Sequence, residues 1–393
     1  MRVLLVTSNW PSHYFQLVPL VWALRADGHE IFVNSQPGFT ETIVRSGAIA
    51  APSGVDIELA EAARLAAADP PREWPADPPT GVSEEDWNGG WREVSRKAFP
   101  MFVKAAELQV DGVIGLAKAL RPDVVVYEPT ALAGPIAAAA IGVPAVRHVL
   151  GVDVVYMARE LIAPLLAPIT DRLGIGRVDP VGAATIDNCP PSMQLESDVT
   201  RLGIRFVPYN GAGTLPGWLL EPAEKPRICV SWGLSASARG RGFLVPSLVE
   251  SLHSLDAEII VAISTADRKN LGPLPSDVRV VESMPLHLLM PSLSAMLHQS
   301  GMGTMLTALS FGVPQLVVPQ MPDELMESRP LGAAGIALPS EEADLGAFQL
   351  AAADLLRDPA YRKAAEEVRD EIREQPSPAE TVIALEELVR TTK

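Results

Sequence analysis

The chain has 393 residues, of which 48% are hydrophobic and 20% are charged, and its formal net charge is −16. This length allows two domains with large cores, and the composition excludes a disordered chain. The negative charge argues against sequence-independent binding of nucleic acid and against docking on an anionic membrane.

The location of the protein is predicted from what the chain lacks. Its two cysteines, Cys189 and Cys229, lie in separate segments and offer neither a disulfide framework nor the spacing of a zinc site. The first 15 residues carry one positive charge and an apolar run that is too short for a signal peptide. No apolar stretch reaches the roughly 20 residues that span a bilayer. We expect a cytoplasmic protein.

Strand and helix patterns alternate through the first half of the chain. Apolar runs of strand length are separated by segments with apolar residues at helical spacing, which is typical of a parallel sheet covered by helices. Residues 52–100 break this alternation, because they are rich in Pro, Gly and Trp and show no periodicity, so they predict a long loop that is functional or mobile. The expected elements are strands at 2–8, 30–36, 122–128 and 144–150 and helices at 15–28 and 130–142.

The second half repeats the alternation. Residues 207–226 indicate a linker, and a new series of strands and helices begins after them. We expect an α/β protein with two facing Rossmann-like domains and C-terminal helices. The predicted divisions are an acceptor-binding domain at 1–206, the linker at 207–226, a nucleotide-sugar-binding domain at 227–375, and a C-terminal helix at 376–393.

One turn has the features of a phosphate cradle. His298 ends an apolar run, and Gly301, Gly303 and Thr304 open the helix pattern that follows. Exposed backbone N–H groups and the positive end of a helix dipole attract anions, and a histidine can donate to a phosphate oxygen. A capped helix beside a buried histidine explains the same residues.

A second turn follows the first strand of the second half. Ser231, Gly233 and Ser235 are small or polar, and such turns bind phosphate through N–H and hydroxyl donors. By itself the segment is better explained as an ordinary solvated loop.

Two residues of the first half suggest acid–base chemistry. His13 lies at a strand-to-helix turn that lacks the Gly spacing of a dinucleotide fingerprint, which disfavours NAD. A neutral imidazole there can act as a general base, and Glu128, which ends another strand, can orient it if the two lie side by side. A helix cap and a solvated carboxylate are the structural alternatives.

Asp323 and Glu324 follow the last predicted strand of the second half. Adjacent carboxylates accept hydrogen bonds from vicinal hydroxyls, as on a sugar, although acidic residues also favour the first turn of any helix.

Taken in order, these segments resemble the glycosyltransferases of the GT-B fold, and more closely the actinobacterial natural-product enzymes that use nucleotide-activated deoxysugars. The resemblance covers essentially the whole chain and lies in segments 12–30, 207–219, 229–235, 281–291, 298–320 and 322–325. The chain departs from the family pattern where His and Gly are common, at Gln299 and Ser300, and also at Ser283, Met302 and Glu327.

The resemblance implies an inverting transfer without a metal or other cofactor, from a dTDP-sugar or another NDP-sugar to an apolar, polyketide or aromatic acceptor. His13 would be the base and Glu128 its orienting partner. The residues that would bind the donor are Ser231, Gly233, Ser235, Met284, His298, Ser300, Gly301, Gly303, Thr304, Asp323 and Glu324. From composition, we expect Trp74, Trp87 and Trp91 to cover the acceptor.

Other functions stay open at this point. A nucleotide-sugar epimerase shares this architecture, and a non-catalytic transferase-like partner protein would carry the same donor motifs. An auxiliary activator protein, a homodimer and a carbon-linked product are also open.

Overall fold

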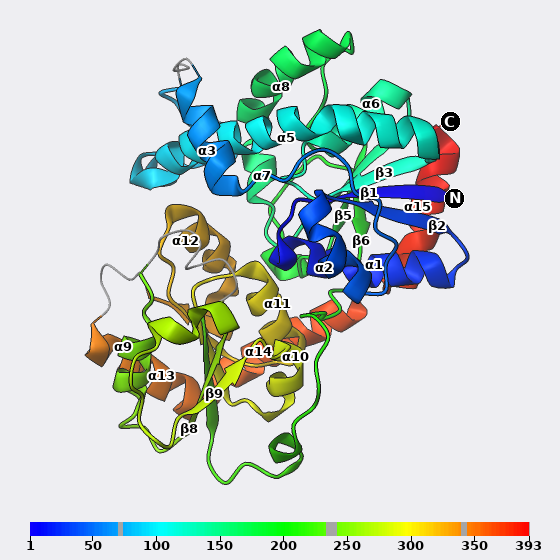
Figure 1. Cartoon of the computed structure of the whole chain (residues 1–393). Coiled ribbons are helices and arrows are strands. Elements are labelled where there is room, and N and C mark those ends of the chain that lie inside the picture. Colours follow the sequence, from blue (N-terminus) through cyan, green and yellow to red (C-terminus); the bar gives the residue numbers. More distant parts are fainter. Residues whose placement is uncertain (70–73, 233–241, 339–343, 393) are drawn as a thin grey trace. The chain divides into compact units, whose positions relative to one another are not determined.

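The computed structural model describes residues 1–69, 74–232, 242–338 and 344–392 (Figure 1). The chain forms two compact units and passes between them more than once. The first unit comprises Met1–Cys189, Gln194–Arg205 and Gln375–Lys393, and the second comprises Pro190–Met193 and Phe206–Glu374. Each unit contains one parallel six-stranded sheet.

The sheet of the first unit has the order β2-β1-β3-β4-β5-β6, and every neighbouring pair is parallel. Its central strands are buried on both faces, which explains their nearly unbroken apolar sequences. The strand order reverses between β1 and β3, and ligands of such sheets bind beyond the carboxyl ends of the strands at this point. The strands are β1 (Arg2–Val6), β2 (Glu30–Asn34), β3 (Val124–Tyr127), β4 (Ala145–His148), β5 (Ala184–Asp187) and β6 (Arg201–Gly203).

Helices cover both faces of this sheet. Figure 1 shows α5 (Arg92–Leu120) and α6 (Ala133–Ile141) on one side and α1 (Pro11–Ala26) and α15 (Pro378–Thr392) on the other. The C-terminal helix α15 therefore belongs to the first unit, where it packs against α1. The remaining helices are α2 (Thr40–Arg45), α3 (Leu59–Ala68), α4 (Glu84–Asp86), α7 (Val154–Met157) and α8 (Arg159–Leu173).

The sheet of the second unit has the order β12-β11-β10-β7-β8-β9, again with every pair parallel. This is the Rossmann order, and its reversal lies between β7 and β10. An apolar cluster around Val230, Leu248 and Leu297 fills one face of the sheet. The strands are β7 (Arg227–Ser231), β8 (Glu258–Ile263), β9 (Arg279–Glu282), β10 (Ala295–His298), β11 (Gln315–Val317) and β12 (Gly335–Ala337), and the helices are α9 (Val245–Leu252), α10 (Leu286–Leu289), α11 (Met302–Ser310), α12 (Pro322–Ser328), α13 (Leu345–Arg357) and α14 (Pro359–Glu374).

The structure differs from the sequence-based expectation in residues 52–100. The predicted loop was wrong, because α3 lies within it and α5 begins at Arg92 and continues through Pro100. Ala, Leu, Glu and Arg dominate α3, and these residues have high helix propensity. Within the described residues, no helix is both long and apolar enough to cross a bilayer.

Candidate active site

His13 and Glu128 meet at the carboxyl end of the first sheet. Nδ1 of His13, in the first turn of α1, lies 3.1 Å from Oε2 of Glu128, which directly follows β3. The indole of Trp10 stacks on the imidazole with ring centroids 4.5 Å apart. A carboxylate can only accept a hydrogen bond, so Nδ1 carries the proton and Nε2 of the neutral ring carries the lone pair of a base.

Two hydroxyl residues hold Glu128. The Ser8 hydroxyl donates to Oε1 over 2.7 Å, and the backbone N–H of Thr130 donates to Oε2 over 2.8 Å. The hydroxyl of Thr130 lies 2.8 Å from Oε1 and 2.9 Å from Oε2. Burial raises the pKa of this fully buried carboxyl, but the charge of His13 and hydrogen bonds from His13, Thr130 and Ser8 outweigh burial and lower its pKa to about 2. Glu128 is therefore an anion across the physiological range.

A small cavity adjoins these residues. Its volume is about 50 Å³, and its lining includes Ser8, Thr130, Gln36 and Gln109. A drug-sized ligand needs roughly 300 Å³ or more, so this cavity by itself does not hold a natural-product acceptor.

The three tryptophans predicted to cover the acceptor lie near the start of α5. Trp87 and Trp91 are 0% and 3% exposed, Trp87 donates to the carbonyl of Ala76, and Trp91 packs edge-on against Phe99. Trp74 is half-buried. Contact of any of the three with an acceptor stays a prediction.

In the second unit, Ser231 and His298 end adjacent strands. They are register partners on β7 and β10, directly at the point where the strand order reverses. His298 is fully buried, with Nε2 2.7 Å from Oε1 of Gln315 and Nδ1 accepting the Ser300 N–H over 3.2 Å. Burial lowers its pKa to about 4, so the ring is neutral. The predicted direct donation to a phosphate would require one of these hydrogen bonds to break, and it stays a prediction.

Ser300 has the most unusual backbone of this turn. Its φ is 75°, in the left-handed region, and its side chain is fully buried. Its hydroxyl donates to the carbonyl of Glu324 over 2.9 Å, so it joins the turn to α12. Ser300 thus adopts the backbone conformation that Gly favours, and its hydroxyl adds a hydrogen bond that Gly would lack.

The turn leads into the amino end of α11. Gly301 is the N-cap, and no side chain among the described residues caps the helix. The N–H of Thr304 donates to the carbonyl of Gly301, while the N–H groups of Met302 and Gly303 have no acceptor within the helix. These two donors face outward along the helix axis, where the dipole favours an anion.

Three further predicted donor residues follow strand ends along the same edge of the second sheet. Asp323 and Glu324 are in the first turn of α12, where Glu324 accepts the Gln320 N–H over 2.9 Å. Met284 follows β9 and packs against an apolar cluster. Gly233 and Ser235 lie outside the described residues.

The residues that support the site were not predicted from the sequence. Ser8, Thr130 and Gln315 contact no substrate in the expected scheme, yet they fix Glu128 and His298. Ser8 lies two residues after the end of β1 and Thr130 three residues after the end of β3, at the reversal of strand order. This position is the signal that could have identified them.

Comparison with known proteins gives matches over the whole chain. Residues 22–233 match the family described as erythromycin biosynthesis protein CIII-like, N-terminal domain, and residues 246–388 match its C-terminal domain. The 10-deoxymethynolide desosaminyltransferase of Streptomyces venezuelae is 34% identical, over 99% of this chain and 97% of its own.

Two solved structures are also similar. Glycosyltransferase VinC in complex with DTDP has a TM-score of 0.82 at 28% identity, covering 100% of both chains. Spinosyn rhamnosyltransferase SpnG complexed with thymidine diphosphate has a TM-score of 0.83 at 29% identity, covering 98% of this chain and 100% of its own. The two parallel-sheet α/β units are those of the GT-B fold.

Proposed function

The chain belongs to the erythromycin biosynthesis protein CIII-like family of glycosyltransferases. From this we propose that it transfers a deoxysugar from a dTDP-sugar or another NDP-sugar to the hydroxyl of an apolar polyketide or aromatic acceptor. The transfer proceeds with inversion and without a metal. The observation that carries the proposal is the contact between His13 and Glu128 at the point where strand order reverses. Relatives that transfer deoxysugars and similar structures with bound thymidine diphosphate support the donor class.

In the proposed mechanism, the first unit activates the acceptor. Nε2 of His13 removes the proton of the acceptor hydroxyl as the oxygen attacks the anomeric carbon, and the bond from that carbon to the diphosphate breaks. Glu128 stabilises the imidazolium that forms, because its negative charge lies 3.1 Å from Nδ1. Positioned base catalysis contributes about 10²–10⁴-fold in rate.

The second unit holds the donor in this scheme. The N–H groups of Met302 and Gly303 and the dipole of α11 stabilise the charge of the departing diphosphate, which is why no metal is required. His298 holds the turn through Ser300, and Asp323 and Glu324 accept hydrogen bonds from sugar hydroxyls. Ser231 and Met284 contact the nucleoside.

The test combines donor binding with product analysis. Thermal shift with a panel of nucleoside diphosphates should favour thymidine diphosphate. Incubation with a dTDP-deoxysugar and apolar aglycones in EDTA should give a glycoside whose anomeric configuration, measured by NMR, is opposite to that of the donor. Retention of configuration, or no transfer until a metal is added, would overturn the mechanism.

The same assay separates the alternatives. Conversion of the donor alone into an epimer identifies an epimerase, whereas donor binding without turnover identifies a non-catalytic partner. We also propose a cytoplasmic location. Transfer that appears only after addition of a second protein would show an auxiliary activator, and sedimentation would test a homodimer.

A further inference from the structure

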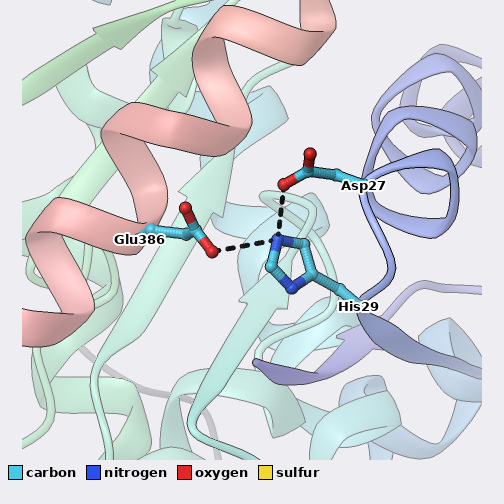
Figure 2. Close-up of side chains that lie close together, drawn as sticks. All are labelled: Asp27, His29 and Glu386. Carbon is cyan, nitrogen blue, oxygen red and sulfur yellow. Dashed lines mark ion pairs between the residues drawn. The ribbon is translucent and has the colours of Figure 1, made fainter.

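A histidine and two carboxylates converge at the end of α1 that lies away from the proposed active site. Nε2 of His29 lies 3.2 Å from Oδ2 of Asp27 and 3.2 Å from Oε1 of Glu386. Figure 2 shows the nitrogen directed between the two carboxylates, with Asp27 at the end of α1 and Glu386 on α15. Since His13 lies in the first turn of α1 and Asp27 is its C-cap, the two are about 21 Å apart along the helix axis.

The local sequence builds this arrangement. Asp27 is the C-cap of α1, and Gly28 has a φ of 87°. The N–H of Gly28 donates to the carbonyl of Arg25 and that of His29 to the carbonyl of Leu24, which is a Schellman motif. The left-handed glycine turns the chain back, so the side chains on either side of it point to the same place.

One ring nitrogen of His29 forms a hydrogen bond, and the other is directed at the carboxylates of Asp27 and Glu386. Nδ1 lies 2.8 Å from the amino nitrogen of Met1, which fixes the ring orientation. The side chain is 7% exposed, and Nε2 is buried without a well-directed hydrogen bond to either carboxylate, despite being close to both. A metal at Nε2 requires the proton on Nδ1, so the amino group of Met1 must be in its neutral form and accept that proton. The contact then corresponds to the hydrogen bond by which a metal-binding histidine usually holds its other ring N–H.

The spacing of the three atoms fits a metal shell. Zinc binds histidine nitrogen and carboxylate oxygen at about 2.0–2.2 Å, so neighbouring ligand atoms in tetrahedral to octahedral shells lie about 3–3.4 Å apart. The two measured separations of 3.2 Å fall in this range, and all three ligand atoms lie within 4.8 Å of one another. Imidazole with carboxylates suits a first-row divalent ion such as Zn²⁺.

We propose that Asp27, His29 and Glu386 form a structural site for a divalent transition metal, of which Zn²⁺ is the best fit. The ion fixes α15 to the turn between α1 and β2 and so holds the C-terminal segment on the first unit. It takes no part in sugar transfer.

The test uses untagged chain, because a polyhistidine tag would bind the ion. Co²⁺ titration of metal-free protein should give visible absorption bands that saturate at one equivalent and disappear on addition of Zn²⁺. His29→Gln and Glu386→Gln should each weaken binding at least tenfold. His253→Gln is the matched control, because His253 pairs with one carboxylate, that of Asp277 at 3.2 Å, among the residues that the structure describes.

Thermal unfolding provides a second readout that does not depend on activity. Zn²⁺ should raise the melting temperature of the wild type and of His253→Gln, and leave that of Glu386→Gln unchanged. Without metal, Glu386→Gln should melt close to the wild type, because a partly exposed ion pair contributes little to stability. Failure to bind a stoichiometric ion, or binding that Glu386→Gln leaves intact, would show that these residues form an ion pair only.

Discussion

Nδ1 of His13 lies 3.1 Å from Oε2 of Glu128, although 115 residues separate them in the chain. The contact exists because β1 and β3 are neighbouring parallel strands, so the segments that follow them emerge at the same edge. Trp10 and the hydroxyls of Ser8 and Thr130 then fix the two side chains from outside the pair.

Replacing either member of this pair should remove most of the catalytic rate. We expect His13→Ala and Glu128→Gln to lower kcat by about 10²–10⁴-fold, since the first removes the base and the second removes the charge that stabilises the imidazolium. Single-turnover kinetics measure this loss. Calorimetry with thymidine diphosphate should show unchanged affinity, and the exposed His253→Ala should retain full rate. A His13→Ala enzyme with near wild-type kcat would disprove the assignment.

The hydroxyls of Ser8 and Thr130 should affect kcat because they position the Glu128 carboxylate, and they should have little effect on substrate binding. Thr130→Val keeps the side-chain shape but removes a donor to an ionised group, an interaction worth about 1.5–3 kcal/mol. We expect kcat to fall about tenfold or more while KM changes little, with Ser8→Ala giving a similar split. Thr391→Val, at an exposed helix position, is the control. If Thr391→Val lost as much kcat and stability as Thr130→Val, the lower rate of Thr130→Val would reflect impaired folding and not the position of Glu128.

Acid should destabilise the second unit through His298. Burial lowers the pKa of His298 to about 4, against an unfolded value near 6.5. The unfolded chain therefore binds the extra proton first, so this contribution to stability is complete above pH 6.5 and is lost as the pH falls toward 4. We expect a loss on the order of 1–3 kcal/mol across this window.

Urea unfolding of wild type and His298→Gln at several pH values measures the effect as the difference between the two curves. The difference should shrink as pH falls from 6.5 to 4. Glu128 adds to the acid loss only from its unfolded value of about 4.5 downward, because its folded pKa is lowered to about 2, and this contribution is common to both proteins and cancels in the difference. If the difference in unfolding free energy between the two proteins did not change with pH, His298 would titrate alike in the folded and unfolded states.

The sequence predicted the parallel strands well, and the physical reason is their burial. Helices cover strands such as β1 and β3 on both faces, so their apolar side chains are buried. Such strands appear in the sequence as short unbroken apolar runs, which are typical of a parallel sheet. Edge strands lack this signal. β6 has the sequence Arg-Leu-Gly with its first residue exposed, and β12 is a three-residue strand at the edge of the second sheet, so neither was predicted. The interior strand β5 was also not predicted, because Thr185 and Asp187 interrupt its apolar run.

Helix content was harder to predict where proline occurs. Pro100 lies inside α5 and Pro164 and Pro168 inside α8, because packing of these long helices outweighs one missing hydrogen bond at each proline. The proximity of His13 and Glu128 was a conditional hypothesis, since a sequence alone does not give strand order. The hydrogen bonds of His298 with Gln315 and of Ser300 with Glu324 could not be predicted, because they depend on side-chain geometry.

Ser300 gives a test of how the phosphate turn is joined to the sugar-contacting residues. Its φ of 75° is unfavourable for any side chain by about 1–2 kcal/mol, and its hydroxyl bond to the carbonyl of Glu324 returns about 0.5–1.5 kcal/mol. Ser300→Ala keeps the strain and loses the bond, so it should lower stability by about 1 kcal/mol. Ser300→Gly loses both, so it should remain close to the wild type.

Donor affinity then shows whether Ser300 acts through its hydroxyl bond to Glu324 or through the shape of its backbone. If the bond to Glu324 positions Asp323 and Glu324 on the sugar, both variants should bind a dTDP-sugar up to about tenfold more weakly while binding thymidine diphosphate as before. If only the backbone shape matters, Ser300→Gly should bind both ligands like the wild type and Ser300→Ala should bind both more weakly. Ser310→Ala, whose hydroxyl bonds within its own helix, is the control for calorimetry. We expect the first pattern, because the hydroxyl of Ser300 forms the bond to Glu324 that a glycine at this position could not form. Unchanged affinity of Ser300→Ala for a dTDP-sugar would exclude this pattern.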